Sequence, residues 1–269
     1  MCFKYTATAC GIFLVLMCCL FTAGCVPNSG EFHGKEGGGI SLNNNDLTLQ
    51  DFAYNPDRDT PYRIGLEEDG TIVPYLVLTD DYNGNCLLLR EYLLDEPRTY
   101  NSSGWYASYY ENSEIDQYLN EEFMKRFPAD LSNDIVDSTI VITAQKSLGI
   151  GGKDTTTITR KVFLLSFSEL HESGSRTNLK EGEPLAYFKE MSARVAYYKN
   201  GVAGTWWLRT ANTADRDVVC SVITDGAVGL GGLGALGEVS LNGVRPAFCL
   251  SRDTKVMKND DGLYVLVQD

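Results

Sequence analysis

The sequence is poor in the residues that bind nucleic acids and metal ions. Its 23 Lys and Arg residues are outnumbered by 36 Asp and Glu residues, and only two His residues occur in 269 positions. A net charge of −13 argues against nucleic-acid binding, which needs clustered cations to neutralise phosphates. His33 and His171 are isolated, so a zinc site or a His-based catalytic triad lacks parts. We therefore expect no metal, no cofactor and no nucleic-acid partner.

Cysteines are scarce beyond the N-terminal segment. Five of the eight fall within the first 25 residues, which leaves Cys86, Cys220 and Cys249 for a folded domain. Three widely spaced cysteines do not make a disulfide scaffold. The sequence predicts small buried hydrophobic side chains at these positions, and it leaves a Cys220–Cys249 pair open.

The chain also lacks an apolar run long enough to cross a bilayer. Residues 11–21 (GIFLVLMCCLF) follow the single cation Lys4 and fall short of the roughly 20 residues that a spanning helix needs. Small residues, Thr22-Ala23-Gly24, then precede Cys25. This junction resembles the lipobox of bacterial lipoproteins, with Thr22 in place of the usual Leu. It predicts a signal peptide over residues 1–24, a lipid on Cys25, and an extracytoplasmic protein anchored to the bacterial cell membrane.

Two alternatives to the lipid anchor remain open. The first is secretion without a lipid, and the second is a short uncleaved anchor. Residues 25–47 are rich in Gly, Asn and Ser, which is typical of a flexible tether. Residues 48–269 are long enough for a single domain.

Hydrophobic patterning predicts an α+β domain of short, mostly antiparallel strands with two main helices. The Asn83-Gly84 pair predicts a β-hairpin between strands 71–78 and 86–90. Apolar residues at helical spacing predict helices over 112–127, ended by Pro128, and over 184–199. Further predicted strands are 138–145 and 160–166, joined by the loop 147–158, then 205–210, 217–224 and 244–250, and a closing hairpin with residues 259–262 at its tip.

Three segments near the C-terminus form a recognisable signature. They are Trp206-Trp207-Leu208-Arg209, Asp225-Gly226 and Gly243-Val244-Arg245-Pro246-Ala247-Phe248. Together they resemble a large family of bacterial extracytoplasmic domains of unknown function marked by WWLR(S/T)…DG…GVRPA(F/L). The resemblance covers about residues 60–252, and it departs from the family pattern at Asp116, Tyr118 and Cys249. It implies a C-type-lectin-like fold, shared with formylglycine-generating enzymes and hypervariable surface receptors, and it implies binding more than chemistry.

The signature residues favour a structural interpretation. At least one of Trp206 and Trp207 is expected in the core, which leaves the other free to lie at the surface, since neighbouring strand residues point to opposite faces. Arg209 and Arg245 each follow an apolar strand residue. We expect them to hold backbone carbonyls or a buried carboxylate, the alternative being clamps for an anionic ligand. Gly243 and Pro246 complete this structural signature.

The residues between the two signature strands are the candidate binding surface. In hypervariable receptors of this fold, ligand contacts lie in this region, which here contains Asn212, Asp215, Arg216, Asp225 and the loop 226–237. A solvated loop without a ligand is the alternative. The spacing Gly229-x-Gly231-x-x-Gly234 imitates a nucleotide-binding turn, but we expect a strand from Val239 where that turn requires a helix.

Signatures of known activities on the same fold are absent. The calcium-binding motifs of sugar-binding C-type lectins do not occur, and the three cysteines do not match the active-site pair of formylglycine-generating enzymes. The sequence therefore favours a lipid-anchored, non-catalytic binding module for an unknown protein or glycan. An enzyme on the same fold and an envelope scaffold protein without a small ligand are the alternatives; a pair of catalytic carboxylates distant along the chain stays open.

Overall fold

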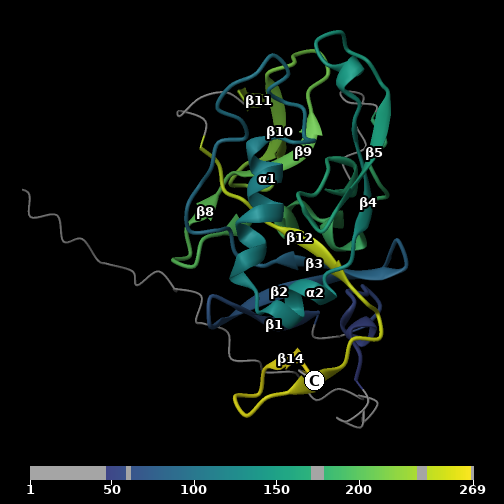
Figure 1. The fold of residues 1–269 in the computed structure, drawn as a ribbon, viewed down its shortest axis with the longest axis vertical. Coiled ribbons are helices and arrows are strands. Elements are labelled where there is room, and N and C mark those ends of the chain that lie inside the picture. The colour runs from purple at the N-terminus through teal and green to yellow at the C-terminus, as the bar shows by residue number, and fades with distance from the viewer. Residues whose placement is uncertain (1–46, 59–61, 171–178, 235–240, 268–269) are drawn as a thin grey trace, which may run out of the picture. The chain divides into compact units, whose positions relative to one another are not determined.

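The computed structural model describes residues 47–58, 62–170, 179–234 and 241–267 (Figure 1). These residues belong to one compact unit of mixed α+β structure, in which most strand pairs are antiparallel. The predicted signal peptide, Cys25 and most of the predicted tether lie outside the described residues, as do His171 and the strand expected from Val239. The described helices all fall short of the length and apolarity that a bilayer-spanning helix needs.

Within the described residues, the largest sheet has seven strands in the order β13-β14-β1-β2-β3-β12-β6. Its neighbours pair antiparallel except β1 and β14, which are parallel. The strands are β1 (Arg63–Glu68), β2 (Thr71–Tyr82), β3 (Asn85–Arg90), β6 (Val162–Phe163), β12 (Ala247–Leu250), β13 (Val256–Lys258) and β14 (Tyr264–Leu266).

Both predicted hairpins are confirmed. Asn83 and Gly84 connect β2 to β3 with φ of 54° and 81°, the positive values that a tight two-residue hairpin turn requires. β2 reaches Tyr82, four residues beyond its predicted end. The closing hairpin joins β13 to β14, and Gly262 near its tip has φ of 79°.

Smaller sheets complete the strand structure. Three strands pair in the order β11-β10-β9, and two further pairs are β4-β5 and β7-β8. Their bounds are β4 (Ser138–Thr143), β5 (Thr155–Arg160), β7 (Ala196–Tyr197), β8 (Ala203–Gly204), β9 (Trp206–Ala211), β10 (Val218–Val222) and β11 (Val228–Gly234). The predicted strand 160–166 is confirmed only in part, over β6 (Val162–Phe163). β5 begins earlier, inside the predicted loop 147–158. Its β-branched run Thr155-Thr156-Thr157 favours an extended strand over a loop.

The first predicted helix is only partly correct. The α-helix α1 spans Glu114–Glu121, and Ser113 caps it by accepting a hydrogen bond from the Asp116 N–H at 3.3 Å. The chain then tightens into the 3-10 helix η2 (Phe123–Arg126), and α2 (Ala129–Asp134) begins directly after Pro128. Phe127 has an extended backbone with ψ of 147°, as expected of a residue before proline.

The second predicted helix is wrong. Residues 184–199 form two 3-10 turns, η5 (Ala186–Lys189) and η6 (Met191–Arg194), followed by β7. Glu190 between them is extended, with ψ of 137°. Phe188 is buried whereas Met191 is 51% exposed, so the apolar stripe does not stay on one face. The other described 3-10 helices are η1 (Leu49–Phe52), η3 (Gln145–Ser147) and η4 (Ser168–Leu170).

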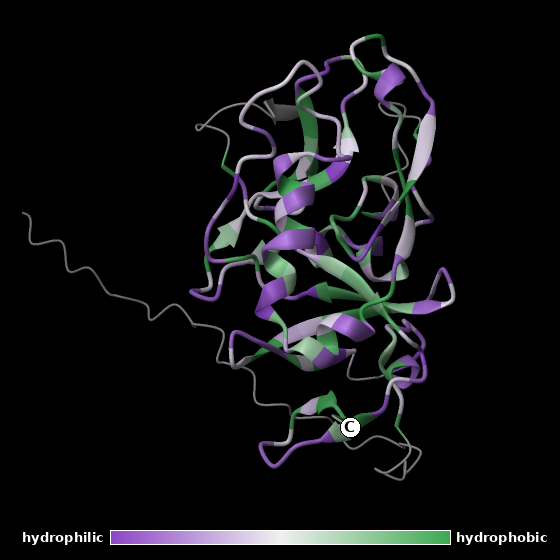
Figure 2. Ribbon diagram, in the orientation of Figure 1, coloured by the Kyte–Doolittle hydropathy of each residue, from purple (hydrophilic) through white to green (hydrophobic). Residues whose placement is uncertain are grey.

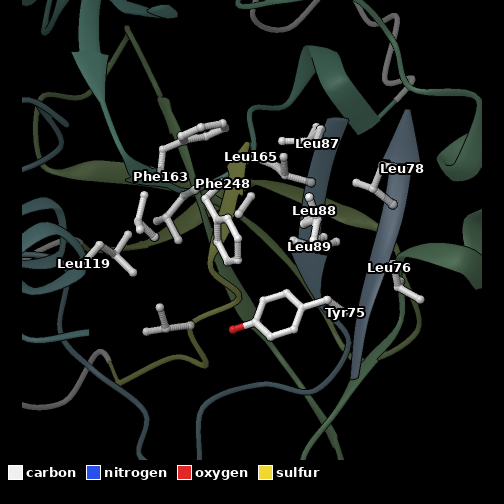
Figure 3. Close-up of a cluster of buried hydrophobic side chains, with 14 of the residues drawn as sticks. Tyr75, Leu76, Leu78, Leu87, Leu88, Leu89, Leu119, Phe163, Leu165 and Phe248 are labelled. Atoms are coloured by element: carbon white, nitrogen blue, oxygen red, sulfur yellow. The ribbon is translucent and has the colours of Figure 1, made fainter. Parts of the chain in front are cut away.

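The hydrophobic core lies on both faces of the central strands, since consecutive residues of β3 and β12 are all buried. Figure 3 shows side chains from β2, β3, β12 and α1 packed together, and Figure 2 shows how hydrophobic the central strands are. Phe248 of β12 is at the centre, with its ring centroid 5.3 Å from those of both Tyr75 and Phe127. This core holds the ends of the strands from which the candidate site extends.

Candidate functional site

The two signature tryptophans are both fully buried in β9. The Trp206 Nε1–H donates to the Arg194 carbonyl at 3.1 Å, and the Trp207 Nε1–H donates to the Arg98 carbonyl at 2.8 Å. The expectation that at least one of them lies in the core is confirmed, and neither lies at the surface. The physical reason is that both faces of β9 are covered, with Arg245 stacked over Trp206 and Tyr100 against Trp207.

Arg209 in the same strand uses all five of its N–H donors inside the protein. Nη1 and Nη2 bind the two Glu169 carboxylate oxygens at 2.8 and 2.7 Å. The remaining donors reach the carbonyls of Val141, Leu164 and Glu181, at 2.8–2.9 Å. Burial opposes the charge on Arg209, but Glu169, Tyr82 and Glu181 together outweigh it and raise the pKa of the guanidinium. Arg209 thus connects β9 to three other segments.

A second buried carboxylate, Glu181, lies beside this ion pair. Thr143 Oγ1 and Thr210 Oγ1 both donate to its carboxylate oxygens. Burial raises the pKa of Glu181, and Arg209 acts in the opposite direction. Tyr82 donates to Glu169 at 2.7 Å, and burial likewise raises the pKa of its hydroxyl. Glu169 and Glu181 are two carboxylates beside the same arginine, but both are 0% exposed, so no substrate reaches them in this conformation.

The second signature arginine, Arg245, also points inward. Its Nε donates to the Arg90 carbonyl at 3.0 Å and its Nη2 to the Glu91 carbonyl at 3.2 Å. Burial lowers the pKa of Arg245 to about 10. The Pro246 carbonyl accepts from the Arg90 N–H at 3.0 Å, which completes the link to β3. At Gly243, an added Cβ would approach the Leu93 Cδ1 to 2.7 Å, so close packing requires glycine there.

Three of the four predicted ligand-binding residues use their side chains to hold turns. The Asn212 side chain accepts from the Ala214 N–H, that of Asp215 from the Asp217 N–H, and that of Asp225 from the Ala227 N–H, at 2.9–3.1 Å. These are local Asx turns, a role that Asn and Asp side chains suit.

Arg216 is the predicted binding residue that the structure places in an exposed cluster. Its guanidinium lies 3.5 Å from the ring centroid of Trp105, whose side chain is 68% exposed. An indole is rarely left this accessible on a protein surface, because its large apolar area is favourable to bury. Sequence reasoning missed Trp105, and the only signal was a Trp within a polar segment, Ser102-Ser103-Gly104-Trp105.

Three loops meet around this stacked pair. Both the Ser108 N–H and its hydroxyl donate to the Arg216 carbonyl, at 3.0 and 2.7 Å. The Gly151 N–H donates to the Thr213 carbonyl at 2.8 Å. The loops after Tyr100, after η3 and after β9 are therefore tied together. They carry the exposed side chains Trp105, Tyr106 and Ile150 and the half-buried Arg216, which together we call the Trp105 patch.

The predicted loop 226–237 is wrong over its described part. Residues 228–234 form β11, which pairs antiparallel with β10 (Figure 1), so Gly229, Gly231 and Gly234 lie in a strand and not in a nucleotide-binding turn. Gly226 precedes this strand with φ of 89°, and an added Cβ would lie 2.2 Å from the Met191 carbonyl oxygen. Residues 235–237 lie outside the described residues.

The three cysteines of the domain are free and buried. The possible Cys220–Cys249 pair is therefore not formed. Burial raises the pKa values of the Cys86 and Cys249 thiols to about 12, and it also raises that of Cys220. Such thiols stay protonated at neutral pH and are poor nucleophiles. No group of three or more His, Cys, Asp or Glu side chains in the described segments is arranged to hold a metal ion.

These features define a class of protein, an α+β domain in which the charged signature residues are buried and an exposed aromatic patch lies on loops joined by hydrogen bonds. The chain belongs to the family described as Domain of unknown function (DUF6273), whose model matches residues 83–252. The matched segment contains β9, β12 and all four residues of the Trp105 patch. No curated protein and no solved structure matches the chain.

Proposed function

We propose that the chain is a lipid-anchored, extracytoplasmic binding module with a C-type-lectin-like fold, and that the Trp105 patch contacts a protein or glycan ligand. The observation that carries the proposal is the 68% exposed Trp105 with Arg216 stacked 3.5 Å from its ring centroid. Trp and Arg are the residues most enriched where binding energy is concentrated in protein interfaces. An exposed indole face also suits stacking on the apolar face of a sugar ring.

The structure around Trp105 supports a preorganised contact surface. Asn101 Nδ2 donates to the Ala107 carbonyl at 2.6 Å, and Asn101 Oδ1 accepts from the Glu114 N–H at 2.9 Å. The loop that carries Trp105 is therefore closed on itself and attached to the start of α1. Binding by such a loop loses less conformational entropy than binding by a mobile one, which raises affinity.

The lipobox-like segment that ends in Cys25 and the polar tether that follows supply the anchor in this proposal. They place the domain outside the cell, at a distance from the membrane that a flexible linker sets. No specific observation favours an enzyme, since the paired carboxylates Glu169 and Glu181 are 0% exposed.

Binding is tested with the full-length chain in detergent, probed with a glycan array and with proteins from the cell surface. We expect a ligand whose capture is lost on Trp105→Ala and weakened on Arg216→Ala. Tyr197→Ala is the matched control, because Tyr197 is an aromatic residue 46% exposed on β7, outside the patch. A ligand held equally by wild type and Trp105→Ala would overturn the assignment to the patch, and the absence of any ligand would remove the support for binding.

The anchor is tested separately by metabolic labelling with a fatty-acid analogue. The wild-type chain and Cys18→Ala should be labelled equally, since Cys18 lies inside the predicted signal peptide. Cys25→Ala should lose the label. Labelling of Cys25→Ala at the wild-type level would refute the lipid anchor.

A further inference from the structure

A second candidate site lies beside α1, where Arg98 separates two hollows of about 240 and 190 Å³. Arg98 and Tyr118 line both hollows, and the Arg98 guanidinium stacks 3.5 Å from the centroid of the Tyr118 ring. The stacked pair thus forms a wall with a cavity on each side.

The half-buried Arg98 side chain differs from the buried Arg90 and Arg209 in having no acceptor within the described part of the chain. Among the described residues, its Nε is buried without a hydrogen-bond partner, and no hydrogen bond or ion pair of its guanidinium is formed. Arg209 by contrast satisfies five donors, and Arg126 pairs with Asp69 at 2.7 Å. A guanidinium beside a cavity and without an acceptor is a site where an anion gains charge-assisted hydrogen bonds.

The backbone holds Arg98 in this position. Its N–H donates to the Asn242 carbonyl at 2.8 Å, and its carbonyl accepts from the Asn242 N–H at 3.2 Å and from Trp207 Nε1 at 2.8 Å. With the backbone fixed and the guanidinium stacked on Tyr118, the side chain loses little further freedom when it binds an anion.

The two hollows differ in chemistry. The smaller one is also lined by Asp95, Glu96 and Arg126, so its acids offset its cations. The larger one has apolar surface from Pro97, Ile115 and Leu241 next to Arg98. Among the described lining residues its one acid is Glu114, whose Oε1 is held in place by the N–H and the hydroxyl of Ser102. The larger hollow therefore combines an unpartnered cation with an apolar wall.

We propose that the larger hollow binds a small carboxylate with an apolar body, such as an N-blocked aliphatic amino acid or the last residue of a peptide. The carboxylate would accept from the Arg98 guanidinium, and the aliphatic group would contact Ile115 and Leu241. This site is separate from the Trp105 patch and does not depend on the function proposed for it.

The test compares two probes that differ only in the carboxylate, N-acetyl-leucine and N-acetyl-leucinamide, titrated into the full-length chain by calorimetry. We expect the acid to bind at least about tenfold more tightly, because only the acid forms charge-assisted hydrogen bonds with Arg98. Equal binding of acid and amide would overturn the proposal. No binding of either up to about 10 mM would do the same, since ligands of this size bind in the millimolar range.

Arg98→Gln should remove the preference for the acid, whereas Arg252→Gln, at an arginine whose side chain is 40% exposed and pairs with Asp80, should keep it. If Arg98→Gln does not fold, Leu241→Glu tests the same site. Leu241 is 51% exposed, so a Glu there is compatible with folding, and its charge should repel the acid probe while leaving the amide unaffected. If Leu241→Glu binds the acid probe as tightly as the wild type does, the acid binds elsewhere and the proposal is contradicted.

A dipeptide with C-terminal leucine then distinguishes the two sources of the carboxylate. Binding equal to or tighter than that of N-acetyl-leucine indicates a peptide end, and loss of binding indicates a free small acid.

Discussion

The Glu169–Arg209 ion pair offers the sharpest test of how this fold is stabilised. Glu169 is 0% exposed and accepts four hydrogen bonds, two from Arg209, one from Tyr82 and one from the Ser166 N–H. Glu169→Gln keeps the shape of the side chain but replaces one carboxylate oxygen with an NH₂ group. Either orientation of the amide points its N–H donors at Arg209 and at a second donor, Tyr82 or Ser166.

The cost follows from burial. Removing one partner of a buried ion pair leaves an uncompensated charge, here on Arg209, and typically destabilises a protein by roughly 3–5 kcal/mol. Asp80→Asn is the matched control, because it also converts an acid paired with an arginine into its amide. The Arg252–Asp80 pair is 3.3 Å long, and its side chains are 40% and 42% exposed. Exposed pairs contribute at most about 1 kcal/mol, so this control should unfold close to the wild type.

The assay is equilibrium unfolding in urea, followed by tryptophan fluorescence, since Trp206 and Trp207 are buried next to the network. We expect the midpoint for Glu169→Gln to fall well below that for Asp80→Asn, with similar slopes. Equal shifts for the two variants would refute the claim that burial of the Arg209 network stabilises the fold. Arg209→Lys should resemble Glu169→Gln, because a lysine ammonium cannot replace five donors in a planar arrangement.

Two further predictions concern the backbone and pH. Gly226→Ala should destabilise the fold by about 2–5 kcal/mol in urea unfolding, because the added Cβ would lie 2.2 Å from the Met191 carbonyl oxygen at φ of 89°. Gly201→Ala is the control, at φ of 80° with no atom within 4 Å of the added Cβ, and it should cost about 1 kcal/mol. Equal costs for the two variants would show that the contact at Gly226 relaxes. Stability should also fall as pH rises from about 9 to about 12, because burial raises the folded-state pKa of Cys249 to about 12 from 9.0, so the unfolded thiol loses its proton first. Cys249→Ala should make this decline shallower by about 1.4 kcal/mol per pH unit, and an unchanged pH slope would contradict the assignment.

The strands were more predictable from the sequence than the helices. The hairpin at Asn83-Gly84 and the strands β9 and β10 follow from local signals, namely turn residues and alternating or continuous apolar runs. The helix over 184–199 failed because its apolar spacing is a local pattern that tertiary packing overrode: Phe188 is buried, Met191 is exposed, and Glu190 between them is extended. Spacing alone does not reveal which positions a neighbouring segment covers.

The candidate site was predictable only in part, and for a similar reason. The sequence directed attention to Arg216, but Trp105 is 111 residues earlier in the chain, and only the folded structure brings the two side chains together. The Asx turns of Asn212, Asp215 and Asp225 were not predicted from the sequence, because the same side chains suit both a turn and a ligand contact. Arg98 carried no sequence signal, since its distinguishing property is that no described residue offers its guanidinium an acceptor in three dimensions.

The buried network and the exposed patch are connected through the strands that they share. Arg209 fixes β9 to β4 through the Val141 carbonyl, and the loops that follow these two strands carry Arg216 and Ile150. The Gly151–Thr213 hydrogen bond then joins the two loops directly. A network that is closed to ligands can in this way determine the geometry of a surface that is open to them, because fixed strand ends leave the short loops beyond them few alternative conformations. It follows that Glu169→Gln should weaken ligand binding at the Trp105 patch even under conditions where the variant stays folded.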